Sequence, residues 1–145
     1  MRASLTCTGD APPAEVWRRY ADLDAWSSWA PLISGVEADG RVLAEGLVGT
    51  VVGVGGVRVR FEVLDVDHES RSWRWRARLG PVQLELQHEV LARPSGGTVA
   101  ALDLVGAPHV VLGYLAPARL ALGALVRPEP GGGFWQGLSR RRVGR

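Results

Sequence analysis

Apolar and polar residues alternate most regularly between residues 57 and 90. Three successive segments there repeat with a period of two, which is typical of strands with one buried and one solvated face. A turn at residues 67–70 and a second turn at Gly80-Pro81 join the segments, and both are short enough for antiparallel neighbours. The pattern predicts an antiparallel meander with a broad apolar face. Its inward positions are Val57, Val59, Phe61, Val63, Trp73, Trp75, Ala77, Val82, Leu84, Leu86 and His88.

Four other segments predict further strands of the same sheet. They cover residues 3–8, 33–37, 47–54 and 98–106, and in the last of them Leu102 is an inward position. An Asp39-Gly40 turn is expected between the second and third, and a turn at residues 94–97 precedes the fourth. The predicted sheet therefore has seven strands.

A first helix is expected after the first strand. Asp10 is its expected N-cap, and Pro12 and Pro13 occupy its first turn, where a missing amide donor does little harm. Its apolar residues fall on one side, so Arg18 and Arg19 are expected to face water. The apolar side carries Val16, Tyr20 and Leu23, with Trp17 beside them.

A second, short helix is expected directly afterwards. Asp22 is its expected cap, and Trp26 and Trp29 follow three residues apart. Because proline disfavours helical backbone at the residue before it, Pro31 ends this helix. Both tryptophans are expected to pack the helix onto the rim of the sheet.

Residues 108–126 form a longer helical pattern that is apolar almost all round. At 1.5 Å per residue this helix would be about 28 Å long, which is near the thickness of a bilayer core. A membrane span and a helix buried against the sheet both explain that composition. Arg119 near the middle would cost about 3 kcal/mol in lipid. A buried helix avoids this cost, so no membrane span is expected.

Composition fits one ordinary globular domain. The chain has 145 residues, of which 46% are hydrophobic and 22% are charged. The net charge of +2 is too small to argue for nucleic-acid binding. We expect residues 1–127 to form the domain. Residues 128–145 contain PEPGGG and SRRRVGR and are expected to form a flexible basic tail.

Residue types and spacings exclude several kinds of chemistry. All 17 basic residues are arginine, which excludes a lysine Schiff base and a phosphate-loop lysine. The three histidines have no metal-ligand spacing and no dinucleotide fingerprint is complete, so no cofactor is expected. The single Cys7 fits a reducing compartment, and residues 1–10 lack the apolar run of a signal peptide. A cytoplasmic location is therefore expected.

The order of these elements and several short motifs resemble the START-like helix-grip superfamily, also called SRPBCC. The matching motifs are APPAEVW at the first helix, Trp26 and Trp29 before Pro31, the Asp39-Gly40 turn, HEV at His88, and GGT at residues 96–98. Together they span residues 2–126. The superfamily includes proteins described as polyketide cyclase or dehydrase and lipid transport. The resemblance implies an α+β helix-grip fold, in which a curved seven-stranded antiparallel sheet grips the C-terminal helix over a cavity for hydrophobic or aromatic molecules.

His88 is the most informative polar residue on the predicted apolar face. If Gly80-Pro81 is a two-residue loop, the register places Trp75 opposite Leu86 and Trp73 opposite His88. One interpretation is a buried neutral imidazole that backbone or water satisfies. The other is a cavity histidine that orients a ligand or acts as general acid and base, because its ordinary pKa near 6.5 suits both roles.

Other inward residues are candidates for ligand contact if the fold keeps a cavity. The aromatic candidates could equally be simple core, and the Tyr114 hydroxyl could point inward or reach solvent at the helix end. The predicted ligand-binding set is Phe61, Trp73, Trp75, Leu86, His88, Leu102 and Tyr114, with His88 as the candidate catalytic residue.

Five arginines alternate with the inward residues and form a basic cluster in the sequence. Glutamates are interleaved with them on the outer face, so a solvated convex surface is the simpler interpretation and nucleic-acid binding is not expected. The cluster consists of Arg58, Arg60, Arg74, Arg76 and Arg78.

Three functions follow from this sequence. The first is a domain that binds a small hydrophobic or aromatic molecule, such as a lipid or a polyketide-like compound. The second is a polyketide cyclase or dehydratase that needs neither metal nor nucleotide and uses His88 to carry protons. The third is a protein-interaction domain with a collapsed cavity. The first two differ in whether the bound molecule is changed, and the third predicts no ligand.

Overall fold

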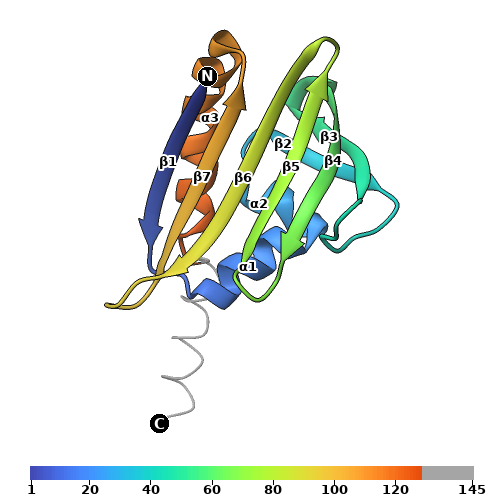
Figure 1. The fold of residues 1–145 in the computed structure, drawn as a ribbon. Helices are drawn as coiled ribbons and strands as arrows, with labels where there is room; N and C mark the ends of the chain where they lie inside the picture. The colour runs from blue at the N-terminus through green and yellow to red at the C-terminus, as the bar shows by residue number, and fades with distance from the viewer. Residues whose placement is uncertain (129–145) are drawn as a thin grey trace.

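The structure, a computed structural model, describes residues 1–128 and contains a seven-stranded antiparallel sheet and three α-helices (Figure 1). The strand order is β1-β7-β6-β5-β4-β3-β2, so the first two strands lie at opposite edges. The elements are β1 (Arg2–Gly9), α1 (Pro13–Ala21), η1 (Leu23–Ala25), α2 (Trp26–Trp29), β2 (Ile33–Ala38), β3 (Val48–Gly53), η2 (Val54–Gly56), β4 (Arg58–Asp67), β5 (Ser72–Leu79), β6 (Val82–Ala92), β7 (Thr98–Gly106) and α3 (Pro108–Leu125).

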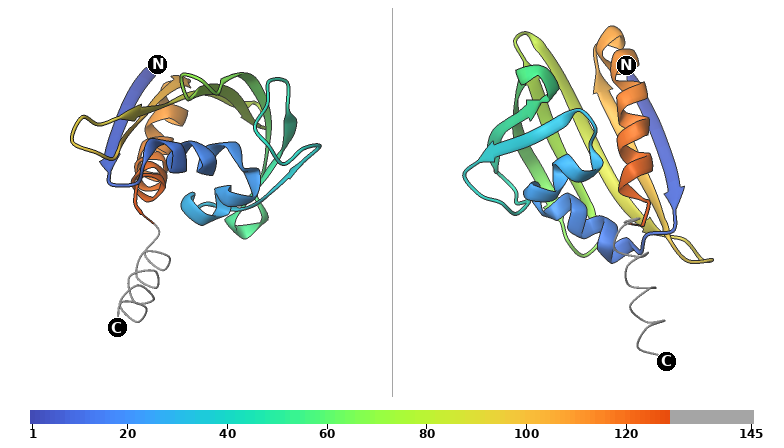
Figure 2. Two further views of the ribbon diagram at one scale, coloured as in Figure 1. Left: turned by 90° about the horizontal axis from the view of Figure 1, so that it is seen from below. Right: turned by 180° about the vertical axis from the view of Figure 1, so that it is seen from behind.

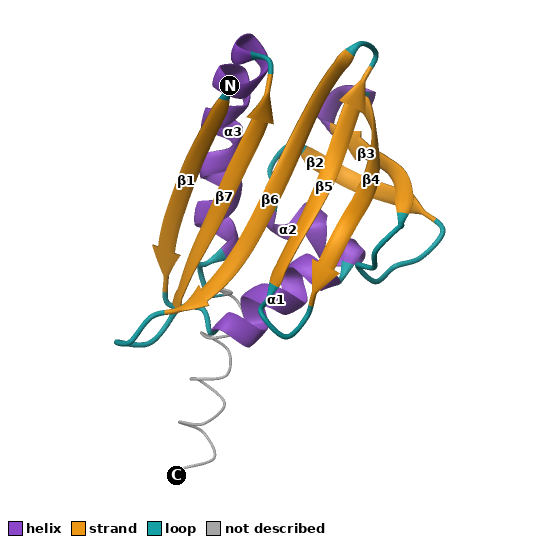
Figure 3. Cartoon of the chain, viewed as in Figure 1, coloured by secondary structure: helices purple, strands orange, loops and turns teal. Residues whose placement is uncertain are grey.

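The sheet curves around the helices, as the view from below in Figure 2 shows. The long helix α3 packs against β1, β7 and β6, while α1 packs against β6. All three helices lie on the concave side of the sheet (Figure 3). The core lies between these two layers and receives the inward residues of every second strand position.

The predicted strands and their register are confirmed. β5 and β6 pair with Trp73 opposite His88, Trp75 opposite Leu86 and Leu79 opposite Val82. The connection between them is the two-residue Gly80-Pro81 loop, in which Gly80 has a φ of 58° that side-chain-bearing residues rarely adopt. Because a shift of one residue would turn every side chain to the other face, this loop determines which residues meet the helices.

The connection between β2 and β3 is longer than the predicted Asp39-Gly40 turn. It covers residues 39–47, and within it the amide of Leu43 donates to the carbonyl of Ala21 at 2.8 Å. Leu43 is only 1% exposed. The longer connection therefore closes one end of the core, a role that a tight turn could not fill.

The predicted N-cap of α1 is wrong, and Asp22 caps the short 3-10 helix η1 that leads into α2 rather than α2 itself. α1 begins at Pro13 after Pro12, whose backbone is extended, and no side chain caps it. Asp10 lies two residues before the N-cap position, so its carboxylate is not placed to accept from the free amides of the first turn. Asp22 accepts a hydrogen bond from the Asp24 amide at 3.0 Å and starts η1.

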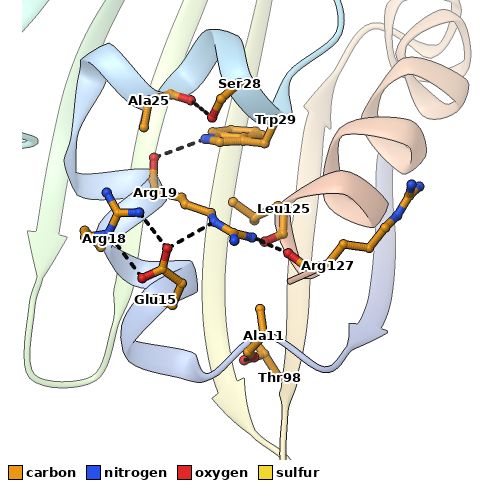
Figure 4. Close-up of polar contacts among 10 residues, drawn as sticks. All are labelled: Ala11, Glu15, Arg18, Arg19, Ala25, Ser28, Trp29, Thr98, Leu125 and Arg127. Carbon is orange, nitrogen blue, oxygen red and sulfur yellow. Dashed lines mark hydrogen bonds and ion pairs between the residues drawn. The ribbon is translucent and has the colours of Figure 1, made fainter. Parts of the chain in front are cut away.

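Arg19 is buried, which corrects the expectation that it faces water. Its side chain donates to the carbonyls of Leu125 and Arg127, both at 2.6 Å (Figure 4). Glu15 lies 3.6 Å from its guanidinium. Leu125 is the last residue of α3, where helix carbonyls lack partners, and Arg127 follows the helix by two residues. Arg18 faces outward as predicted and pairs with Glu15 at 2.6 Å.

The predicted apolar helix is confirmed as α3, but only one side of it packs against the sheet, because Leu112 and Leu120 are 56% and 64% exposed. Its buried residues are Val111, Ala118, Leu122 and Leu125. Within residues 1–128 it is the one helix with the length and hydropathy to cross a bilayer. Because it packs along the sheet, α3 is not a clear membrane span. The predicted basic tail lies outside the described residues from position 129 onward.

Candidate functional site

Two adjoining apolar cavities lie between the sheet and the helices. The histidine cavity, of about 60 Å³, is lined by residues including Trp73, His88 and Leu102 from the sheet and Tyr114 and Ala118 from α3. The valine cavity, of about 280 Å³, is lined by side chains of β3, β4, β5 and β6 and again by Tyr114. Both cavities share the walls Leu32, Ile33, Trp75 and Tyr114. They form one candidate site with two parts.

The valine cavity opens to solvent between the segment after α2 and the β3–β4 connection. Leu32, Val54 and Val57 line it, and these residues are 54%, 61% and 47% exposed. Gly53 also lines the cavity between them. An apolar molecule could enter here without crossing a charged surface, because the residues at the mouth carry only carbon side chains.

His88 has protein partners on both ring nitrogens. The Trp75 indole donates from Nε1 to Nε2 of His88 at 2.9 Å, and the Tyr20 hydroxyl lies 3.0 Å from Nδ1. Because an indole nitrogen only donates, Nε2 must be unprotonated, and in a neutral ring the proton is on Nδ1. His88 then donates from Nδ1 to the Tyr20 oxygen. Neither nitrogen has a lone pair available to a ligand.

Burial keeps both members of this pair neutral. His88 is 5% exposed, and the loss of hydration lowers its pKa to about 3. Tyr20 is fully buried, and burial raises the pKa of its hydroxyl far above the ordinary value, with a smaller contribution from Tyr114. The uncharged hydrogen-bond chain from Tyr20 through His88 to Trp75 is therefore stable at neutral pH.

Three aromatic rings, those of Tyr20, Trp73 and Trp75, contact the His88 ring. The Trp73 ring stacks on the imidazole with a centroid distance of 4.5 Å and an interplanar angle of 12°. Trp75 stacks on Trp73 at 5.4 Å, and Tyr20 and Trp26 also contact Trp73. Trp73 is 1% exposed, and its Nε1 has no hydrogen-bond partner within residues 1–128.

The structure places the predicted ligand-binding residues as follows. Trp73, Trp75, His88, Leu102 and Tyr114 line the histidine cavity, and Leu86 lines the valine cavity. Phe61 lines neither cavity. It is 4% exposed and packs its ring against Trp26 and Trp75.

Sequence analysis missed Tyr20 as the partner of His88. The two residues are 68 positions apart, and α1 brings them together only because it packs across β6. The available signal was the position of Tyr20 on the apolar side of the predicted helix. Leu32 and Ile33, which line both cavities, were also missed. Leu32 lies between the predicted short helix and the next predicted strand, and Ile33 is the first residue of that strand, whose place in the sheet the alternation alone does not give.

The charged side chains gather on the opposite face of the sheet. An open depression of about 720 Å³ there is lined by residues including Arg60, Arg76, Arg78 and Glu62. Neighbouring arginines are paired, since Arg58 contacts Glu37 at 2.6 Å and Arg74 contacts Asp65 at 2.9 Å. Within residues 1–128, no three His, Cys, Asp or Glu side chains gather where they could hold a metal ion.

Comparison with solved structures shows the same fold in other proteins. A protein from Nitrosospira multiformis matches with a TM-score of 0.73 at 17% identity, covering 87% of this chain and 94% of that one. A protein from Mesorhizobium loti matches with a TM-score of 0.73 at 15% identity, covering 86% and 93%. Ara h 8.0201 matches with a TM-score of 0.65 at 15% identity, covering 86% and 97%. The predicted helix-grip fold is thereby confirmed.

Sequence comparison assigns the chain to a family. A search of curated proteins finds no match. The model of one family, described as polyketide cyclase / dehydrase and lipid transport, matches residues 2–129, which is most of the chain. The match agrees with the resemblance to START-like proteins and with the cavity between sheet and C-terminal helix. The chain therefore belongs to the polyketide cyclase / dehydrase and lipid transport family.

Proposed function

We propose that this protein binds a neutral, hydrophobic or aromatic small molecule in the joined histidine and valine cavities and does not change it chemically. The observation that carries the proposal is the apolar lining of both cavities around a histidine whose ring nitrogens are both engaged by the protein. Such a lining favours ligands through burial of apolar surface, at roughly 25 cal/mol per Å². The family description, which includes lipid transport, supports a ligand of this class.

The residues that line the two cavities favour an uncharged ligand. Among the described residues that line the two cavities, none is Asp, Glu or Arg. An ionised ligand would therefore lose its hydration without gaining a counter-ion, which is strongly unfavourable. A neutral ligand loses much less hydration free energy when it enters the cavities. Stacked tryptophans at one side of the cavity favour a flat, aromatic portion in the ligand.

The alternative of a cyclase or dehydratase requires His88 to exchange protons with a substrate. For that step its Nε2 would have to release the Trp75 indole, or its Nδ1 would have to release Tyr20. A pKa of about 3 also leaves it a poor base at neutral pH. These contacts favour binding without catalysis. The shared family description covers both activities, so turnover is tested alongside binding.

Native mass spectrometry of the freshly purified protein tests the proposal. We expect an extra mass of one small neutral molecule that is lost when the chain is denatured. Incubation with the released molecule should return it unchanged, whereas a loss of water or a new ring would establish the enzyme. A bare chain whose tryptophan fluorescence responds to no fatty acid, sterol or polyaromatic compound would overturn the proposal in favour of an interaction domain.

A further inference from the structure

We propose that the Tyr114 hydroxyl is the polar anchor of the ligand and donates a hydrogen bond to a neutral acceptor oxygen, such as that of a ketone, a quinone or an ester. Tyr114 lies on α3 and lines both the histidine cavity and the valine cavity. This role rests on the proposed function and specifies the chemistry of its ligand. A ligand of this class is mostly apolar and carries one uncharged oxygen where the two cavities meet.

Tyr114 stands on the side of α3 that faces the cavities. Residues three, four, seven and eight positions apart share one face of a helix. Pro117, Ala118, Ala121 and Leu122 follow Tyr114 at these spacings and line the histidine cavity with it. Alanine and proline have short side chains, so they leave the tyrosine ring uncovered where it borders the cavities.

The Tyr114 hydroxyl is directed into the protein. Burial raises the pKa of this hydroxyl, although the residue as a whole is only half-buried. The hydroxyl also contributes to the raised pKa of Tyr20, whose own hydroxyl lies in the core beside His88. A tyrosine whose hydroxyl reached solvent at the end of the helix would show neither effect. The Tyr114 hydroxyl is therefore uncharged at neutral pH and lies on the cavity side of α3.

The Tyr114 hydroxyl has no hydrogen-bond partner among the described residues, and it is not sealed in the core. These two properties together distinguish it from the Trp73 N–H, which also lacks a partner but is fully covered. A buried donor without an acceptor costs about 1–3 kcal/mol, so the hydroxyl proton needs a partner. An acceptor oxygen that enters the cavity supplies it.

No other polar side chain that lines the cavities is free to bind a ligand within residues 1–128. The Nε2 of His88 accepts from Trp75, and its Nδ1 faces Tyr20. The indoles of Trp26 and Trp29 donate to main-chain carbonyls at 2.9 and 3.1 Å. Apart from the covered indole described above, the remaining lining side chains are carbon. The position of the Tyr114 hydroxyl therefore determines where the ligand carries its oxygen.

A neutral acceptor suits this position better than a carboxylate. No cationic side chain lines either cavity among the described residues, so a carboxylate would be buried without a counter-ion. A carbonyl oxygen accepts the hydrogen bond and needs no counter-ion. The two volumes also set the orientation of the ligand. Its ring system would occupy the valine cavity of about 280 Å³, and the histidine cavity of about 60 Å³ has room only for a small group beyond the oxygen.

A pair of probes that differ in one acceptor oxygen tests this role of Tyr114. We choose 9-fluorenone and fluorene, which share a ring system while only fluorenone has a carbonyl. In the full-length protein, Tyr114→Phe removes the hydroxyl and keeps the ring. Tyr20→Phe is the matched control, because it removes the other tyrosine hydroxyl of the chain, which lines neither cavity and contacts His88. Circular dichroism establishes that each variant is folded at the temperature of the binding measurement.

We expect Tyr114→Phe to weaken fluorenone binding about fivefold to tenfold, which corresponds to the loss of one hydrogen bond, and to leave fluorene binding unchanged. Tyr20→Phe should leave the ratio of the two affinities as it is in the natural protein. The carbonyl stretch of bound fluorenone should lie at lower frequency in the natural protein than in Tyr114→Phe, because a hydrogen bond to the oxygen weakens the C=O bond.

Other results would overturn the anchor. Equal fluorenone affinities for the natural protein and Tyr114→Phe, or a carbonyl stretch that the substitution does not move, would show that the hydroxyl does not contact the ligand oxygen. An equal loss of fluorene and fluorenone binding would show that the substitution only changes the shape of the cavity. In these cases fluorene binding by the natural protein still supports the proposed function. Failure of both probes to bind would overturn the anchor, and together with a bare chain in native mass spectrometry it would overturn the proposed function itself.

Discussion

A histidine between a tyrosine and a tryptophan has little freedom in its protonation state. In this protein the indole of Trp75 fixes the unprotonated nitrogen of His88, and the remaining proton points at Tyr20. Burial then disfavours the imidazolium, because the charged form would lose its hydration. At the scale of single residues, His88 acts as a neutral connector between α1 and β5, and its role is to hold the aromatic wall of the cavity in place.

Tyr20→Phe tests this connector. The substitution removes the acceptor of the His88 Nδ1–H and leaves that donor buried, so the free energy of unfolding should fall by about 1–3 kcal/mol. Urea denaturation measures this change in the free energy of unfolding. Tyr114→Phe is the control, because the Tyr114 hydroxyl has no partner among the described residues and its loss should cost less than about 1 kcal/mol. Equal losses for both variants would contradict the hydrogen bond between Tyr20 and His88.

The pKa of His88 predicts a pH dependence of stability. The unfolded chain binds a proton at His88 near pH 6.5, whereas the folded protein binds it only near pH 3. Between these values the unfolded state holds the extra proton, so stability falls as the pH is lowered through this window, by up to about 1.4 kcal/mol per pH unit. Urea denaturation from pH 7.5 to 4.5 should show this slope relative to His88→Gln, in which the contribution is absent.

The comparison with His88→Gln removes the contributions of the carboxylates, which are the same in both proteins. An NMR titration of the His88 ring gives an independent check if the variant folds poorly. Its signals should stay constant from pH 8 to pH 5. A titration of His88 near its ordinary pKa of 6.5 would rule out the neutral connector and would restore the general acid or base as a candidate.

The sequence predicted the sheet side of this site and missed the helix side. Local rules suffice to place Trp73 opposite His88, because a two-residue loop fixes the register of its two strands. No local rule places Tyr20 against His88, since that contact depends on how α1 crosses the sheet. The unpartnered N–H of Trp73 was equally inaccessible, because it is known only once every neighbouring acceptor has been placed.

At the scale of elements, α1 and α3 are joined at their ends by main-chain and side-chain contacts. Arg19 donates to the carbonyl of Leu125, the last residue of α3, and to that of Arg127 just beyond it, and the amide of Ala11 donates to the carbonyl of Val126 at 3.1 Å. The buried Thr98 hydroxyl donates to the Ala11 carbonyl at 2.6 Å and adds β7 to this junction (Figure 4). These contacts set where α3 ends, and α3 forms one wall of the cavity.

Arg19→Met should weaken this junction. Methionine keeps much of the apolar stem but leaves the carbonyls of Leu125 and Arg127 without their charged donor, so the free energy of unfolding should fall by about 2–3 kcal/mol. Amide hydrogen exchange in the last turn of α3 should also become faster. Urea denaturation and hydrogen exchange measure the two effects on the same samples.

Arg18→Met is the matched control for this prediction. Arg18 precedes Arg19 on the same helix, and its side chain is 52% exposed and paired with Glu15. Exposed ion pairs contribute little, so this change should alter stability by less than about 1 kcal/mol. If the two substitutions had the same effect, the contact of Arg19 with α3 would not be stabilising. Helical periodicity could not separate these neighbours, because it predicted both as solvent-facing.

At the scale of the whole molecule, the cavity exists because a curved sheet and a single helix leave space that their side chains do not fill. The sheet bends around α3, but α3 covers β1, β7 and β6 at one side. The opposite side, with β3 and β4, is covered by the short α2 and the segment after it, and the valine cavity lies there. Periodicity predicted all seven strands and α3, yet the unfilled volume depends on their curvature.

A larger side chain at Ala77 should separate ligand binding from stability. Ala77 lines the valine cavity, so Ala77→Leu would fill part of its roughly 280 Å³ with new apolar contacts. Filling an existing cavity commonly raises stability by about 0.5–2 kcal/mol, whereas the space for a ligand is lost. We expect fluorene affinity to fall at least tenfold and the thermal midpoint to stay the same or rise.

Ala101→Leu, on the opposite face of the sheet, should leave fluorene affinity unchanged. A fluorene affinity that survives Ala77→Leu in a folded protein would place the ligand elsewhere, because a group that occupied the valine cavity could not tolerate the added side chain.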